Sequence, residues 1–334
     1  MKEQHKYLSS AIRAVSEASK ATRAVQAELE SIRQMTKDDR SPVTVADFAA
    51  QAIVCQRLAD DLGSIDMVGE ESAAEIREPG KEALAQAVVQ TIQKYRPDLG
   101  DDAALGAIDI GSHDASKSSY WTLDPIDGTK GFLRGGQYAV SLAYIENGQV
   151  VLGVLGCPNM SADFGRAFDN PAVDGCVYYA TLDGGSWYLP ENDLTRAPEQ
   201  IHANEKIDLN ALRVCESVES SHSKQDDTAR ILAHLKATSA PARLDSQCKY
   251  AVVGRGQADA YLRLPTHAGY VEKIWDHAAG KLIAEQAGAI VTDVHGKPLD
   301  FTTGATLKNN KGVICSAGSI HAEIIAAINT LGIA

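Results

Sequence analysis

The spacing of apolar residues predicts two helices in the N-terminal part of the chain. Between residues 5 and 34, apolar side chains recur at intervals of three and four, the pattern of an amphipathic helix with charged residues on its other face. Pro42 then predicts an extended segment, because the residue before a proline is driven away from helical geometry. A second helix is predicted to begin at Asp47, near its N-cap, followed by a short strand over 65–72 and a helix over 81–95.

From Tyr120 onward the pattern becomes that of β-strands. Runs of β-branched and aromatic residues predict hairpins with turns at Asn147–Gly148 and at 183–185. The segments assigned to these strands and their turns are 120–125, 138–148, 149–158 and 176–189. The first half is therefore predicted to pack helices against an antiparallel sheet.

Strand and helix patterns alternate in the second half, which predicts an α/β arrangement. Strands are predicted over 213–219, 241–246, 258–265 and 289–294, and helices over 223–236, 249–257, 276–286 and from Ser319. We place the boundary between the two halves near residue 160, which predicts an N-terminal α+β domain over 1–160 and a C-terminal α/β domain over 161–334.

The composition is typical of a globular protein, and the net charge argues against some kinds of partner. The 334 residues are 44% apolar and 23% charged, which is ordinary for a globular protein large enough for two domains. A net charge of −12 argues against nucleic acid polymers and anionic membranes as partners, because both require a basic surface. The scattered cysteines, without a C-x-x-C pair, predict reduced thiols. With no apolar leader or membrane-length apolar run, we expect a cytoplasmic protein.

Acidic residues stand at the ends of four predicted elements, where an α/β scaffold exposes side chains into a crevice. Hard cations such as Mg²⁺ prefer oxygen ligands and bridge to substrate phosphates. Taken singly, each acid has a simpler interpretation as a helix cap, a solvated surface group or a turn residue. The acids are Asp47, Glu70 with Glu71, Asp124 with Asp127, and Asp276.

The same acids lie in motifs of a known family. GEES at 69–72, DPIDGTKGF at 124–132 and WDHAAG at 275–280 resemble the inositol monophosphatase superfamily. Within it, SPVTVAD at 41–47, LDSQCKY at 244–250 and YLRLP at 261–265 are similar to the 3′(2′),5′-bisphosphate nucleotidases. The resemblance implies a two-domain layered αβαβα sandwich of the inositol monophosphatase and fructose-1,6-bisphosphatase type, and generally a monomer.

The resemblance also implies a metal site and a catalytic pair. Two or three Mg²⁺ ions are expected, with inhibition by Li⁺ and with Na⁺ as a further candidate inhibitor. Asp47 and Thr129 correspond to the catalytic pair beside a metal-activated water that attacks phosphorus in line. The metal ligands would be Glu70, Asp124, Asp127, Asp276 and the backbone carbonyl of Ile126.

Substrate-binding residues are implied in both halves. Gly128 and Thr129 offer backbone N–H groups at a predicted helix start, which suits an anion. The remaining residues correspond to positions that hold adenosine bisphosphate in the nucleotidases: His222, Ser246, Lys249, Arg263 and Asp276. Around His222 the match is loose, so its register can differ by a few residues.

The leading hypothesis is hydrolysis of the 3′-phosphate of adenosine 3′,5′-bisphosphate to AMP, with its 5′-phosphosulfate analogue as a further substrate and a role in sulfate assimilation. An inositol phosphatase acting on inositol 1-phosphate or inositol 1,4-bisphosphate is the alternative, alone or as a second activity. A nucleotide sensor with a decayed site is disfavoured by the intact acids. A two-metal nuclease is disfavoured by the net charge of −12.

Overall fold

The computed structural model describes residues 2–29, 41–219, 224–267 and 269–333. A seven-stranded sheet runs in chain order from β1 to β7 and is antiparallel except for the parallel pair β1–β2. Its strands are β1 (Met67–Gly69), β2 (Ser119–Asp127), β3 (Ala139–Glu146), β4 (Gln149–Cys157), β5 (Cys176–Thr181), β6 (Ser186–Pro190) and β7 (Glu199–Gln200).

A five-stranded mixed sheet is built from the second half of the chain. Its spatial order is β11 (Ala289–Thr292), β12 (Val313–Ala317), β10 (Ala260–Arg263), β8 (Val214–Glu216) and β9 (Ala242–Arg243). The β8–β10 and β8–β9 pairs are parallel, whereas β12 is antiparallel to both of its neighbours.

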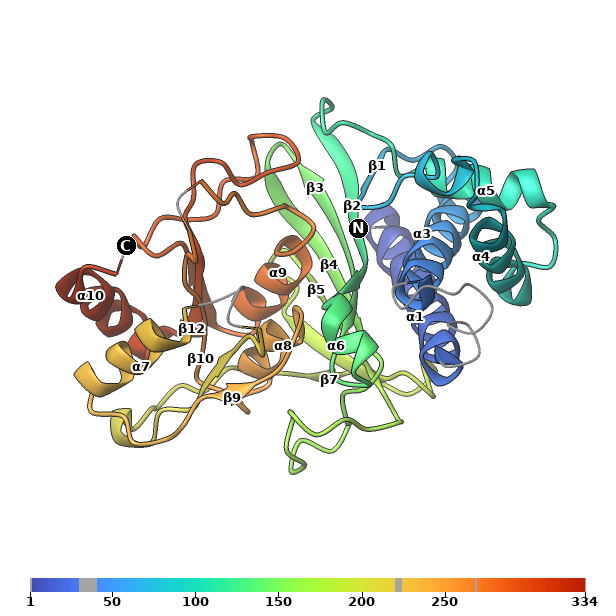
Figure 1. Ribbon diagram of the computed structural model, residues 1–334. Helices are drawn as coiled ribbons and strands as arrows, with labels where there is room; N and C mark the ends of the chain where they lie inside the picture. Colours follow the sequence, from blue (N-terminus) through green and yellow to red (C-terminus); the bar gives the residue numbers. More distant parts are fainter. Residues whose placement is uncertain (1, 30–40, 220–223, 268, 334) are drawn as a thin grey trace.

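Helices complete five layers (Figure 1). The helices α1 (Lys2–Ala27) and α3 (Ser41–Leu62) cover the outer face of the seven-stranded sheet, with α4 (Glu82–Tyr95) and α5 (Asp101–Asp109) packed against α3. Between the sheets lie α8 (Cys248–Gly254) and α9 (Ala278–Gln286), within the largest apolar core. Outside the second sheet lie α7 (Gln225–His234) and α10 (His321–Leu331). The predicted αβαβα sandwich is thus confirmed.

Most predicted elements are present, and the hairpin turns adopt the expected backbone geometry. Asn147 has φ +50° and Gly148 φ +76°, the left-handed conformations that a tight turn between two twisted strands requires. Asp183 and Gly185 have φ +60° and +75° at the next hairpin. Side-chain chemistry at the turns therefore determines where these antiparallel strands reverse.

The prediction that a helix begins at Asp47 after an extended segment is wrong. The helix α3 begins at Ser41, so Pro42 lies in its first turn and Asp47 in its second. A proline is tolerated there because the first N–H groups of a helix have no intrahelical partner. The first helix ends at Ala27, and the part of its predicted range beyond residue 29 lies outside the described residues.

The sequence pattern did not predict α5, β12 or the two-residue strand β7, and the proposed domain boundary falls within a sheet. The helix α5 was assigned to polar loop, and β12 was left without a strand. Residue 160 lies between β4 and β5 of the seven-stranded sheet, and the chain passes to the second sheet only between Gln200 and Val214. The division of the chain into two independent domains at residue 160 stays a prediction.

Candidate active site

A cavity of about 450 Å³ opens where the two sheets and α9 meet. On one side it is lined by Glu70, directly after β1, by β2 and by the short helix α6 (Thr129–Leu133). On the other side it is lined by β10, by residues before and at the start of α8, and by Asp276, two residues before α9. Its lining includes these predicted site residues: Glu70, Asp124, Ile126, Asp127, Gly128, Thr129, Ser246, Lys249, Arg263 and Asp276. The structure thus gathers residues that lie up to about 200 positions apart in the chain.

The parallel pair of β1 and β2 places two of the acids side by side. Met67 pairs with Trp121 and Gly69 with Leu123, so both strands end at the same edge. The backbone N–H of Glu70 donates to the carbonyl of Leu123 at 3.2 Å, which brings Glu70 next to Asp124. A shift in register between Asp124 and Asp127 on β2 changes the direction of the strand and keeps both in the cavity.

The carboxylates repel one another in a buried place. Burial, and then the charges of Glu70 and Asp127, raise the pKa of Asp124 well above its usual value. Burial also raises the pKa of Asp127. The pKa of Asp276 is raised well above its ordinary value by burial and by the charges of Asp127 and Glu70, although the positive charge of Arg263 lowers it. Burial raises the pKa of Glu70, partly offset by a hydrogen bond with Asp124. Such a cluster is stabilised by a bound cation.

The donor set suits a hard divalent cation. The Oδ1 atom of Asp124 is buried and, among the described residues, has no hydrogen-bond partner. Four carboxylates converge with the backbone of Ile126, which lines the cavity although its side chain packs in the core. Oxygen-only donors of this kind are those that Mg²⁺ binds.

Asp47 reaches the same cluster from the helix α3. It is 7% exposed, and burial followed by the charges of Glu71 and Glu70 raises its pKa well above the usual value. Thr129 lines the cavity as the first residue of α6. Among the hydrogen bonds of the described residues, none joins the Thr129 hydroxyl to Asp47, so the implied catalytic pair stays a prediction.

The turn before α6 requires glycine at position 128. Gly128 has φ +91°, and a β-carbon there would lie 2.9 Å from Cβ of Ser246. The backbone of Gln247 donates to Asp127 Oδ2, which ties the same segment to the acidic cluster. Residues 127–129 therefore pack directly on the segment that carries Ser246.

Two cations line the other side of the cavity. Lys249 is 2% exposed, donates to the carbonyl of Leu244 at 3.2 Å and lies 5.1 Å from the centre of the Tyr261 ring. Burial lowers its pKa, opposed by the charge of Asp127. Arg263 donates from Nε to Glu272 Oε1 at 2.8 Å, and its Nη2 atom lies 3.9 Å from Asp276. His222, the remaining predicted contact, lies outside the described residues.

Two residues near the cavity received no role from the sequence analysis: Gln247, which was not named, and Glu71, which was named only as a candidate acid. The Gln247 amide donates to Ser141 Oγ at 2.7 Å and to the Trp275 carbonyl at 2.8 Å, and accepts from the Gly280 backbone at 2.9 Å. It thus joins β3, the segment before α9 and α9 itself. Glu71, whose pKa burial and neighbouring acids raise to about 8, adds to the acidic side. Both lie within the quoted motifs, which was the only signal in the sequence.

Lys130, within the motif DPIDGTKGF at 124–132, forms an ion pair at the rim of the cavity. Its Nζ atom lies 3.0 Å from Glu219 Oε2, and Arg134 contacts both Glu219 and Asp245. The short helix α6 is therefore linked by charge to the segment after β8, across the cavity rim.

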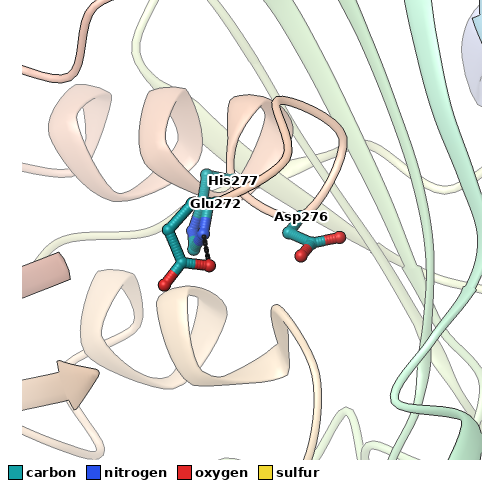
Figure 2. Close-up of side chains that lie close together, drawn as sticks. All are labelled: Glu272, Asp276 and His277. Carbon is teal, nitrogen blue, oxygen red and sulfur yellow. Dashed lines mark hydrogen bonds and ion pairs between the residues drawn. The ribbon is translucent and has the colours of Figure 1, made fainter. Parts of the chain in front are cut away.

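One acidic group near the cavity is not a separate metal site. Donor atoms of Glu272, Asp276 and His277 lie within 4.8 Å of one another. Figure 2 shows that Glu272 is hydrogen-bonded to His277, whereas the Asp276 carboxylate points away from this pair. Because Glu272 also pairs with Arg263, Asp276 alone among the three belongs to the acidic cluster.

The layers and the cavity define a class: an αβαβα fold whose interlayer cavity brings a cluster of buried carboxylates together with the basic side chains of Lys249 and Arg263. Residues 3–332 match the model of the inositol monophosphatase family. The chain belongs to this family.

Curated relatives and a solved structure agree with this assignment. A 3′(2′),5′-bisphosphate nucleotidase of Schizosaccharomyces pombe is 43% identical over 303 residues, 88% of this chain and 85% of the relative. One from Oryza sativa is 38% identical over 337 residues, 96% of this chain and 93% of the relative. An inositol monophosphatase structure from Anabaena, 18% identical, covers 99% of this chain and 97% of its own with a TM-score of 0.63, which supports the fold. The resemblance to the nucleotidases is thereby confirmed.

Proposed function

We propose that this protein hydrolyses the 3′-phosphate of adenosine 3′,5′-bisphosphate to give AMP and phosphate, with Mg²⁺ as the cofactor. The observation that carries the proposal is the two-sided cavity, in which carboxylates face Lys249 and Arg263. A substrate with two separate phosphates matches two such sides, one for the reacting phosphate and one for the phosphate that is kept. Relatives of 38–43% identity named for this activity support it.

Glu70, Asp124, Asp127, Asp276 and the carbonyl of Ile126 would hold the metal. Bound Mg²⁺ would lower the pKa of the attacking water and would compensate the negative charge that develops on the phosphate. Asp276 lies beside Arg263 and so stands at the boundary between the two sides. It is therefore proposed as a substrate contact as well as a ligand.

The protein's own groups would orient the reaction. The backbone N–H groups at Gly128 and Thr129 would bind oxygens of the reacting phosphate. The Thr129 hydroxyl would orient the attacking water, and the Asp47 carboxylate would take its proton. Attack on phosphorus opposite the 3′-oxygen would break the P–O3′ bond, and the leaving 3′-oxygen would take a proton from solvent water to become the 3′-hydroxyl of AMP.

Lys249, Ser246 and Arg263 would bind the phosphate that is retained. Lys249 and Arg263 each use some of their N–H groups to bind protein acceptors, and their remaining N–H groups are available for an anion. The 5′-phosphosulfate analogue carries negative charge at the same end and is proposed as a second substrate. His222 remains a predicted contact.

Location and assembly stay at the level of prediction. A small-molecule substrate agrees with a cavity of about 450 Å³ and with the names of the relatives. None of the helices among the described residues is long and apolar enough to cross a bilayer. A cytoplasmic location, a monomeric state and inhibition by Li⁺ are further parts of the proposal.

Phosphate release from adenosine 3′,5′-bisphosphate and from inositol 1-phosphate, measured side by side with Mg²⁺ or with chelator, tests the proposal. We expect Mg²⁺-dependent release that is faster from the nucleotide. Brisk release from inositol 1-phosphate with none from the nucleotide would establish the inositol phosphatase instead. Binding of the nucleotide without turnover, with Mg²⁺ present, would favour a sensor.

A further inference from the structure

Arg263 is held along one edge of its guanidinium group. Nε donates to Glu272 Oε1 at 2.8 Å, and Nη2 lies 2.8 Å from Glu272 Oε2. Nη2 also donates to the Tyr270 hydroxyl at 3.2 Å. Among the hydrogen bonds of the described residues, none uses Nη1. Since Arg263 lines the cavity, its Nη1 edge is the part left for a ligand.

Glu272 is itself fixed from behind by a buried chain of hydrogen bonds. It is 4% exposed, and its Oε2 atom lies 3.1 Å from His277 Nε2. Figure 2 draws this contact as a dashed line. On the other side of the ring, His277 Nδ1 lies 2.8 Å from the Tyr250 hydroxyl. The pKa of Glu272 is lowered to about 2 by Arg263 and His277 despite its burial. Both oxygens of Glu272 already face donors of Arg263, so the arrangement is complete when Nε2 of His277 donates to Glu272 and Nδ1 accepts from the Tyr250 hydroxyl.

The position of Asp276 explains why such a support is needed. Its carboxylate lies 3.9 Å from Arg263 Nη2, close enough to attract the guanidinium strongly. If Arg263 moved onto Asp276, the cavity would lose a cation on one side and a carboxylate on the other. The bidentate pair with Glu272 competes with that movement and keeps the two groups apart.

We propose that Glu272, supported by His277 and Tyr250, is a positioning residue that sets specificity for substrates with a second anionic group. It directs the Nη1 edge of Arg263 toward that group and keeps Arg263 from pairing with Asp276. This inference rests on the proposed function, since the second group is the 5′-phosphate of the nucleotide.

Two substrates that differ only in this group provide the test: adenosine 3′,5′-bisphosphate and adenosine 3′-phosphate. The wild-type protein should prefer the bisphosphate, and a wild type without this preference would contradict the proposed substrate rather than the role of Glu272. In Glu272→Gln, KM for the bisphosphate should rise roughly tenfold with kcat within about twofold, because the guanidinium is no longer held on both oxygens. The constants for adenosine 3′-phosphate should change by less than about threefold.

A matched control separates positioning from general loss of a buried ion pair. Glu191 is 1% exposed and pairs with Arg23 at 2.6 Å outside the cavity. Glu191→Gln should leave the preference for the bisphosphate unchanged. The proposal would be overturned if Glu272→Gln lowered kcat/KM equally for both substrates, or if it changed kcat/KM for neither.

A double-mutant cycle tests whether Glu272 acts through Arg263. In an Arg263→Lys background, Glu272→Gln should cause little further loss of preference, whereas additive losses would contradict the mechanism. If Glu272→Gln does not fold, Tyr250→Phe removes only the hydroxyl behind His277. It should shift the preference in the same direction by about threefold, and an unchanged preference would overturn the supporting role of the chain.

Discussion

The acidic and the basic side of the cavity differ in how the protein compensates their charges. On the acidic side, Asp124 and Asp127 lie near other carboxylates, and burial with mutual repulsion raises the pKa of Asp124. On the basic side, Arg263 has a buried carboxylate partner and Lys249 a backbone acceptor. We therefore propose that the acidic side requires a bound cation, whereas the protein itself supplies partners for both residues of the basic side.

The largest expected effect is the loss of turnover in Asp127→Asn. A neutral amide is a poorer ligand and cannot compensate a divalent charge, so kcat should fall by roughly a thousandfold or more. Phosphate release at saturating Mg²⁺ measures this, with folding verified by circular dichroism. Activity within tenfold of the wild type would show that Asp127 is not a required ligand.

The next effect concerns stability on the basic side. Arg263→Ala leaves Glu272 buried without its cation, which should lower the free energy of unfolding by about 3–5 kcal/mol. Denaturant unfolding measures this loss, and KM for the bisphosphate should rise while kcat changes little. Arg263→Lys, which keeps the charge, should lose less. Wild-type stability in Arg263→Ala would contradict the stabilising role of the pair of Arg263 and Glu272.

On the acidic side, removing a charged group should raise the stability of the protein, whereas Arg263→Ala on the basic side should lower it. In the presence of chelator at neutral pH, Asp124→Asn should be more stable than the wild type by about 1–2 kcal/mol, because one repelling charge is removed. Thermal unfolding with and without Mg²⁺ measures this. Mg²⁺ should stabilise the wild type and have much less effect on the variant. A variant that is less stable than the wild type without metal would refute uncompensated repulsion.

A backbone change tests the contact between the two sides. Gly128→Ala places a β-carbon at φ +91° and 2.9 Å from Ser246, so it should cost about 1–3 kcal/mol of stability. Gly63→Ala, at φ +87° with open space around it, is the matched control for backbone strain alone. Equal losses in both variants would show that the close approach contributes nothing.

The smallest effect is expected at the cavity rim. Lys130 and Glu219 form an exposed pair, so Lys130→Gln should change the free energy of unfolding by less than about 1 kcal/mol. Urea unfolding at low and high salt measures it. A larger loss would mean that this bridge, rather than the packing of Gly128, holds the two sides together.

Local patterns predicted the hairpins and most helices, because turn chemistry and apolar spacing act over a few residues. They failed at Pro42, where a proline that can end a helix instead lies in the first turn of one. They also failed at β12, a short run buried on both faces, which periodicity cannot distinguish from a helix or a loop.

For the site, four of the acids in the motifs line the cavity, namely Glu70, Asp124, Asp127 and Asp276. Their role as metal ligands stays a prediction. The supporting contacts of Gln247 and Glu272 could not be predicted, since each joins segments that only the folded chain brings together. Asp47 was placed correctly near the acids but for the wrong local reason, as it lies within α3 rather than at its start.

The most direct test of the two-sided cavity is to identify which phosphate leaves adenosine 3′,5′-bisphosphate. Chromatography or phosphorus NMR of the Mg²⁺-dependent reaction distinguishes the two possible nucleotide products. Our account predicts adenosine 5′-phosphate, because the acidic side acts on the 3′-phosphate while Lys249 and Arg263 retain the 5′-phosphate. Formation of adenosine 3′-phosphate, or no release at all with Mg²⁺ present, would contradict it.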